Sequence, residues 1–117
     1  MRSLPQIQKL LASLVALAVL VILVIAFWRQ NVVLAILLLS LSIGVFSVSR
    51  DRKRELIPFL TGAVLGPVME AVVMRSGAWQ YANPTMQGVP LWLPFLWGLT
   101  AVFLMKISRW CTSAAAS

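Results

Sequence analysis

The chain lacks histidine and carries one cysteine, Cys111, and only three acidic residues. These absences exclude a Ser-His-Asp triad, a Cys-His dyad and a histidine metal site. No disulfide can form within the chain, so we expect helix packing to stabilise it and Cys111 to be a free, reduced thiol. We expect no metal and no cofactor. Charge of either sign is also scarce, because 11% of the 117 residues are charged while 61% are hydrophobic.

This excess of apolar residues indicates that lipid is the solvent. A chain of 117 residues forms one domain at most. A soluble domain of that size could not bury so much apolar surface, because small folds bury a modest fraction of their chain. The net charge of +7 does not indicate a nucleic-acid partner. The basic residues stand in short connections between apolar runs, as membrane topology signals do.

Four apolar runs separated by polar residues predict an all-α fold. We expect a polytopic membrane protein whose single domain, residues 1–117, is a four-helix transmembrane bundle. The predicted spans are about residues 10–28, 32–49, 57–74 and 91–108, and the longest outer loop is 75–90. The first run resembles a signal peptide, but Phe27-Trp28-Arg29 is not a small-residue cleavage site, so we expect a retained helix.

The distribution of basic residues predicts the orientation. With the N-terminus inside, one side holds eight basic residues and the other holds Arg29 and Arg75. The eight are Arg2, Lys9, Arg50, Arg52, Lys53, Arg54, Lys106 and Arg109. The positive-inside rule then places both termini in the cytoplasm (N-in/C-in). We expect a multi-pass protein of the inner (cytoplasmic) membrane.

Glu70 is an acid inside the third predicted span. An ionised carboxylate in hydrocarbon costs several kcal/mol, so such residues usually face a protein interior or a wet cavity. One interpretation is a carboxylate that binds a ligand or a proton at the mouth of a pocket. The other is a structural pair, in which Arg29, Arg75 or loop amides satisfy Glu70.

Four aromatic residues are expected on the same side as Glu70. Trp79 and Tyr81 belong to the outer loop, and Trp92 and Trp97 to the fourth span. Together with Glu70 they are candidates to bind an apolar or cationic ligand. The alternative is an ordinary interfacial belt for Trp79, Tyr81 and Trp92, and packing against the bundle for Trp97.

Two sets of small residues predict close helix contacts. Gly62 and Gly66 precede Glu70 at four-residue steps, on one helix face. Ser40, Gly44 and Ser47 share one face of the second span. Small residues let transmembrane helices approach closely, so we expect these two faces to pack against each other.

The second half of the chain also resembles known membrane proteins. It carries Gly66-Pro67-x-x-Glu70, Gly77-x-Trp79-x-Tyr81, Pro90-x-Trp92 and Leu96-Trp97. This pattern resembles a group of uncharacterised bacterial inner-membrane proteins and is distantly similar to the carotenoid-biosynthesis hydratase family, over about residues 62–103. The resemblance implies a hydrophobic, isoprenoid-like ligand near Glu70, Trp79 and Tyr81. The hydratase-like proteins are larger and have more helices.

Three classes of function follow. The first is a non-catalytic membrane protein that acts through helix packing or binds an apolar ligand, a partner membrane protein or a second copy, as a subunit of a larger complex. The second is a membrane-embedded enzyme that modifies an isoprenoid or lipid with Glu70 as general acid. The third is a small proton-coupled transporter. With Glu70 as the one carboxylate in the spans, we favour the first class. Small multidrug transporters carry their acid in the first helix, which has none here.

Overall fold

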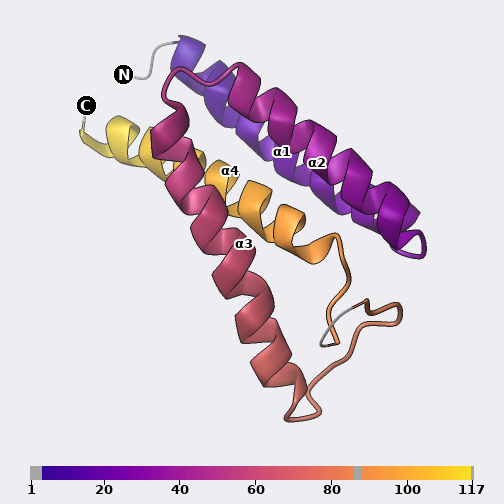
Figure 1. Ribbon diagram of the computed structural model, residues 1–117. Coiled ribbons are helices and arrows are strands. Elements are labelled where there is room, and N and C mark those ends of the chain that lie inside the picture. Colours follow the sequence, from indigo (N-terminus) through magenta and orange to yellow (C-terminus); the bar gives the residue numbers. More distant parts are fainter. Residues whose placement is uncertain (1–3, 86–87, 117) are drawn as a thin grey trace.

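The computed structural model describes residues 4–85 and 88–116. Within these residues it contains four α-helices and no strand, as expected for an all-α fold. They are α1 (Leu4–Phe27), α2 (Asn31–Ser47), α3 (Arg52–Met74) and α4 (Leu93–Ala116). The chain runs up and down, so that both ends and the α2–α3 turn lie together (Figure 1). We call this the termini end, and the opposite one, with the α1–α2 turn and the α3–α4 loop, the loop end.

The helix α4 is the centre of the bundle. It packs against α3, α1 and α2, while α1 and α2 pair with each other as an antiparallel hairpin (Figure 1). Its side chains Leu93, Leu99 and Val102 are fully buried. Leu34 and Leu38 of α2 are fully buried as well. The core is therefore built around one helix whose leucines meet those of the hairpin.

Two of the helices are long and apolar enough to cross a membrane. They are Gln6–Phe27 and Arg52–Met74, and only 11% of the apolar window of each is buried inside the protein. The core helix of a soluble protein would instead be mostly buried. The helix α2 is apolar as well but shorter.

Three helix ends differ from the predicted spans. The helix α3 begins at Arg52 and not near residue 57, because Asp51 caps it by accepting a hydrogen bond from the backbone N–H of Arg54 at 3.2 Å. The helix α1 begins at Leu4, and α4 extends to Ala116, well past residue 108. Hydropathy shows where the apolar residues stop. The helix itself continues through polar residues whose side chains hydrogen-bond to its own backbone. Thr112, for example, donates to the carbonyl of Ser108.

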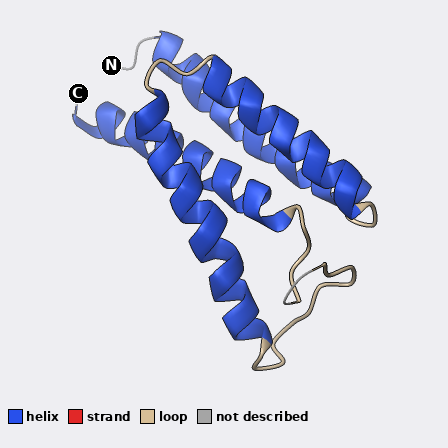
Figure 2. Ribbon diagram, in the orientation of Figure 1, coloured by secondary structure: helices blue, strands red, loops and turns tan. Residues whose placement is uncertain are grey.

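The basic residues are segregated along the bundle. Lys9, Lys106, Arg109 and the Arg50–Arg54 segment belong to the termini end, whereas Arg29 and Arg75 belong to the loop end (Figure 1). Arg2 lies outside the described residues. The segments that connect the four helices are two short turns and one long loop (Figure 2).

Candidate functional site at the loop end

Glu70 is held by two hydrogen-bond donors from different parts of the chain. Tyr81 of the α3–α4 loop donates its hydroxyl to Oε1 at 2.7 Å, and Trp97 of α4 donates its indole N–H to Oε2 at 2.6 Å. Glu70 itself lies on the last turns of α3. Both carboxylate oxygens thus have a protein partner, and the carboxylate joins α3, the loop and α4.

The two glycines of α3 let Trp97 reach this position. A Cβ on Gly66, one turn before Glu70, would overlap the Trp97 ring. A Cβ on Gly62 would lie 2.6 Å from the Trp97 carbonyl oxygen and 2.7 Å from Cβ of Ala101. Contacts below 3.0 Å are not tolerated in close-packed structures, so only glycine fits. The Gly-x-x-x-Gly motif is therefore the surface of α3 on which α4 and the Trp97 side chain pack.

The expected pairing of the two small-residue faces was wrong. The face of α3 packs on α4, whereas Ser40, Gly44 and Ser47 of α2 are exposed, and nothing lies within 4 Å of a Cβ built on Gly44. The hydroxyls of Ser40 and Ser47 donate to carbonyls of their own helix. Spacing identified both faces, but the partner depends on how α3 crosses the bundle, which no local pattern encodes.

Tyr81 is sandwiched between Glu70 and Trp92. Its ring meets that of Trp92 edge to face, with centroids 6.1 Å apart. Burial raises the pKa of the Tyr81 phenol well above its usual range, and the hydrogen bond and negative charge of Glu70 raise it further. Tyr81 therefore stays protonated and acts as a donor to Glu70.

Trp92 is buried and continues the network to the other half of the molecule. Its indole N–H donates to Oδ1 of Asn31 at 3.0 Å. The Asn31 amide donates to the carbonyl of Asn83 and to Oγ1 of Thr85, both at 3.0 Å. Asn83 donates in turn to the carbonyl of Arg29 at 2.9 Å. The loop is thus fixed to the α1–α2 turn by side chains.

Sequence reasoning missed the three polar residues of this network, Asn31, Asn83 and Thr85. The gap between the predicted spans 10–28 and 32–49 places Asn31 in a turn, but it is the first residue of α2. The available signal was its position between an apolar helix and a turn, where a side-chain amide usually bonds to backbone. Its distant partners, more than 50 positions along the chain, could not be inferred from local spacing.

The remaining expected partners of Glu70 lie elsewhere. Among residues 4–85 and 88–116 the one ion pair is Glu55–Lys106, so neither Arg29 nor Arg75 pairs with Glu70. The Arg29 guanidinium lies over the Trp28 ring at 5.0 Å. Trp79 is 45% exposed and makes no hydrogen bond to Glu70, but it lines the same cavity.

That cavity is a groove of about 570 Å³ between α3 and α4. Leu65, Met69 and Val73 line it from α3, and Trp97, Ala101 and Leu104 line it from α4. Its wall consists almost entirely of carbon, even though Glu70 is one of the lining residues near its loop end. The carboxylate oxygens are turned to Tyr81 and Trp97, so the groove offers an apolar surface and no free polar group.

Comparison with protein-family models, with curated proteins and with solved structures finds no match to this chain.

Proposed function

We propose that this chain is a multi-pass protein of the inner membrane that binds an apolar chain, such as a lipid tail or an isoprenoid, in the groove between α3 and α4. The observation that carries the proposal is the carbon-lined groove beside a carboxylate whose two oxygens each accept a hydrogen bond from the protein. The groove volume of about 570 Å³ lies within the range of small-molecule sites.

Insertion into a bilayer is supported by the outer surface of the helices. Large apolar side chains are exposed on each of them, for example Ile25 of α1, Ile36 of α2, Val64 of α3 and Leu104 of α4. Soluble proteins rarely expose large contiguous apolar patches. The basic residues gather at the termini end, which favours cytoplasmic termini by the positive-inside rule.

The shape of the groove favours a chain over a partner helix. It follows α3 from Ile57 to Val73, about 24 Å at the rise of an α-helix. A partner helix packs closely through small residues. A Cβ on Gly62 or Gly66 would meet Trp97 or Ala101, so the close approach that these glycines permit is already made by α4.

The state of Glu70 favours binding over catalysis or proton transport. A general acid needs a proton that can reach the substrate, and a proton carrier needs an oxygen that opens to water. Here Tyr81 and Trp97 occupy both oxygens and turn them away from the carbon wall. Glu70 therefore links α3 to the loop and to α4, and these contacts shape the loop end of the groove.

The resemblance of residues 62–103 to the carotenoid-biosynthesis hydratase family makes an isoprenoid the first ligand to test. The chain is smaller than those enzymes, so we propose that it acts as a binding protein or as a subunit of a larger membrane complex.

Photo-crosslinking tests the proposal directly. The purified protein in lipid nanodiscs is irradiated with diazirine-bearing geranylgeraniol or diazirine-bearing palmitate, and the labelled peptides are mapped by mass spectrometry. We expect labels on groove residues such as Leu65, Met69 and Leu104. Labels spread evenly over the exposed faces of α1 and α2 would contradict a specific groove.

A matched pair of variants sharpens the test. Leu65 and Val64 are neighbours on α3 with exposed fractions of 53% and 59%, but only Leu65 lines the groove. We expect Leu65→Trp to fill the groove and reduce labelling several-fold, and Val64→Trp to leave labelling unchanged. Equal labelling of the two variants would show that the probe does not enter the groove.

A further inference from the structure

A second cavity lies at the opposite end of the bundle and differs from the groove in its charge. It measures about 490 Å³ and is lined by parts of α1, α3, α4 and the α2–α3 turn. Five of its lining residues are basic, and two, Asp51 and Glu55, are acidic. The basic ones are Lys9, Arg50, Arg54, Lys106 and Arg109. This excess of positive charge favours an anionic ligand.

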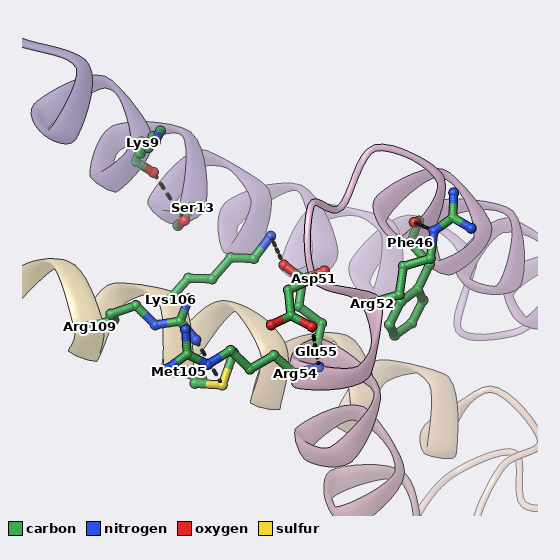
Figure 3. Close-up of polar contacts among 10 residues, drawn as sticks. All are labelled: Lys9, Ser13, Phe46, Asp51, Arg52, Arg54, Glu55, Met105, Lys106 and Arg109. Carbon is green, nitrogen blue, oxygen red and sulfur yellow. Dashed lines mark hydrogen bonds and ion pairs between the residues drawn. The ribbon is translucent and has the colours of Figure 1, made fainter.

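Most of this positive charge is not neutralised by the protein. Lys106 reaches from α4 to Glu55 at the start of α3, with Nζ 2.8 Å from Oε1 (Figure 3). This is the one ion pair in the described part of the chain. The Lys9 ammonium lies over the Trp110 ring at 4.9 Å, and Arg109 contacts the sulfur of Met105. Four cations around the cavity therefore lack a carboxylate partner.

Two buried polar atoms on residues that line the cavity also lack a hydrogen-bond partner. They are Oε2 of Glu55 and Oγ of Ser49. Glu55 is 8% exposed, so its second oxygen is cut off from bulk water. A hydroxyl can donate to a phosphate oxygen, whereas a carboxylate oxygen needs a donor. A ligand that carries both an anionic phosphate and a hydroxyl group satisfies both atoms.

An apolar groove adjoins the cavity. Val48, which is 81% exposed, lines the charged cavity and also the apolar groove, which measures about 600 Å³ and lies between α1 and α2. The apolar groove is lined by aliphatic side chains such as Val19, Leu23 and Leu41 and by the uncovered Gly44. A charged site and an apolar site thus lie next to each other, as the head group and tail of a membrane lipid do.

We propose that the termini end binds one anionic phospholipid with a glycerol-phosphate head group. The phosphate lies among Arg50, Arg54 and Arg109 and accepts from Ser49, a head-group hydroxyl donates to Oε2 of Glu55, and an acyl chain follows α2 past Val48. This inference rests on the membrane insertion proposed above but not on the ligand of the α3–α4 groove.

Native mass spectrometry of the protein released from mixed micelles tests this site. The probes are phosphatidylglycerol, phosphatidylcholine and soluble glycerol 3-phosphate. We expect one phosphatidylglycerol molecule to be retained in preference to phosphatidylcholine, and glycerol 3-phosphate to bind far more weakly. Equal retention of the two lipids would overturn the proposal. Binding of glycerol 3-phosphate as tight as that of the lipid would also overturn it, in favour of a soluble phosphate ligand.

Variants with the same net charge locate the site. The double variant Arg54→Gln/Arg109→Gln removes two cations that line the cavity, whereas Arg52→Gln/Lys53→Gln removes two at the start of α3 that do not. We expect the first to weaken phosphatidylglycerol retention by about thirty-fold, since each basic residue near an anionic head group contributes to binding, and the second to have little effect. Equal effects of the two would show diffuse attraction without a site.

Ser49→Ala separates binding from folding. Because the Ser49 hydroxyl has no partner in the protein, its loss should leave the midpoint of unfolding in lipid-free detergent unchanged and should weaken retention of phosphatidylglycerol several-fold. Unchanged retention would exclude Ser49 from the site and contradict the proposed contacts. If the chain did not insert into nanodiscs, the membrane assignment would fail. If it inserted but showed no lipid preference, only this inference would fail.

Discussion

The indole N–H of Trp97 donates to Oε2 of Glu70 at 2.6 Å, while the same Trp97 ring covers Gly66 one turn earlier on α3. One side chain of α4 therefore uses both features that mark α3 in the sequence, the glycine pair and the acid. The Gly-x-x-x-Gly face positions Trp97, and Trp97 in turn satisfies Glu70. This explains why an acid is tolerated at the end of an apolar helix that is otherwise largely exposed.

Trp97→Phe should destabilise the bundle by about 1.5–3 kcal/mol, because it removes a hydrogen bond to a charged group and leaves a part-buried carboxylate oxygen without a partner. The free energy of unfolding in detergent measures this effect. Trp110→Phe is the control, since its ring contacts Lys9 at the other end of the molecule. In the double variant Trp97→Phe/Glu70→Gln, the loss of stability should be much less than the sum of the two single losses. Full additivity would show that Trp97 and Glu70 are not coupled.

Gly66→Ala should destabilise the protein by about 1–3 kcal/mol, as overpacking of a filled core does. The added methyl overlaps the Trp97 ring, which cannot move without giving up its bond to Glu70. Gly44→Ala is a matched control on a helix, since nothing lies within 4 Å of its Cβ. It should be neutral or stabilising by up to about 1 kcal/mol through helix propensity. Equal thermal stability of Gly66→Ala and the parent would contradict the close packing of α4 on the α3 glycines.

The sequence predicted the number and type of the helices better than their contacts. Long apolar runs and the charged Arg50–Glu55 segment specify four helices, because both signals are local. The grouping of Glu70 with Tyr81, Trp92 and Trp97 at one end was also expected, since the loop returns the chain over the end of α3. The hydrogen bonds were not. Whether Glu70 meets an arginine or an indole N–H depends on how α3 is rotated relative to α4. The spacing of the glycines defines this rotation only once the helix that packs on them is known.

The same reasoning explains the two cases that local patterns missed. Asn31 contacts Asn83 and Thr85, which follow it by more than 50 positions, and no short window of sequence contains such a relation. Glu55 belongs to a charge cluster that looks like a solvated topology signal, yet it is buried against Lys106. Its burial follows from the early start of α3 at Arg52, which hydropathy does not report.

The titration of Tyr81 provides a direct measure of the Glu70 contact. Tyr81 is the one tyrosine of the chain, so the absorbance of phenolate reports it alone. Its folded pKa is raised above the unfolded value of 10.0. The stability that this shift contributes is therefore fully present below about pH 10 and is lost as the pH rises through the folded pKa. We expect ionisation of the folded protein to be delayed to higher pH than in urea.

Glu70→Gln should move the ionisation of Tyr81 back toward its ordinary value, because it removes the negative charge that opposes formation of phenolate. Burial, the larger cause, remains in the variant, so the return should be partial. Identical titration curves for the parent and the variant would show that the two groups do not interact in solution.

The orientation in the membrane can be tested by cysteine labelling of intact cells. In a Cys111→Ser background, a single cysteine at Gln80 in the α3–α4 loop should react with a membrane-impermeant maleimide, and one at Lys53 should react only after the cells are opened. Met86 is a second loop position, and it lies outside the described residues. The expectation follows from the gathering of basic residues at the termini end, which the positive-inside rule assigns to the cytoplasm. Both Gln80 and Lys53 are exposed, so differences in reactivity report the side of the membrane and not burial. Labelling of Lys53→Cys but not Gln80→Cys in intact cells would reverse the orientation and place the phospholipid cavity in the outer leaflet.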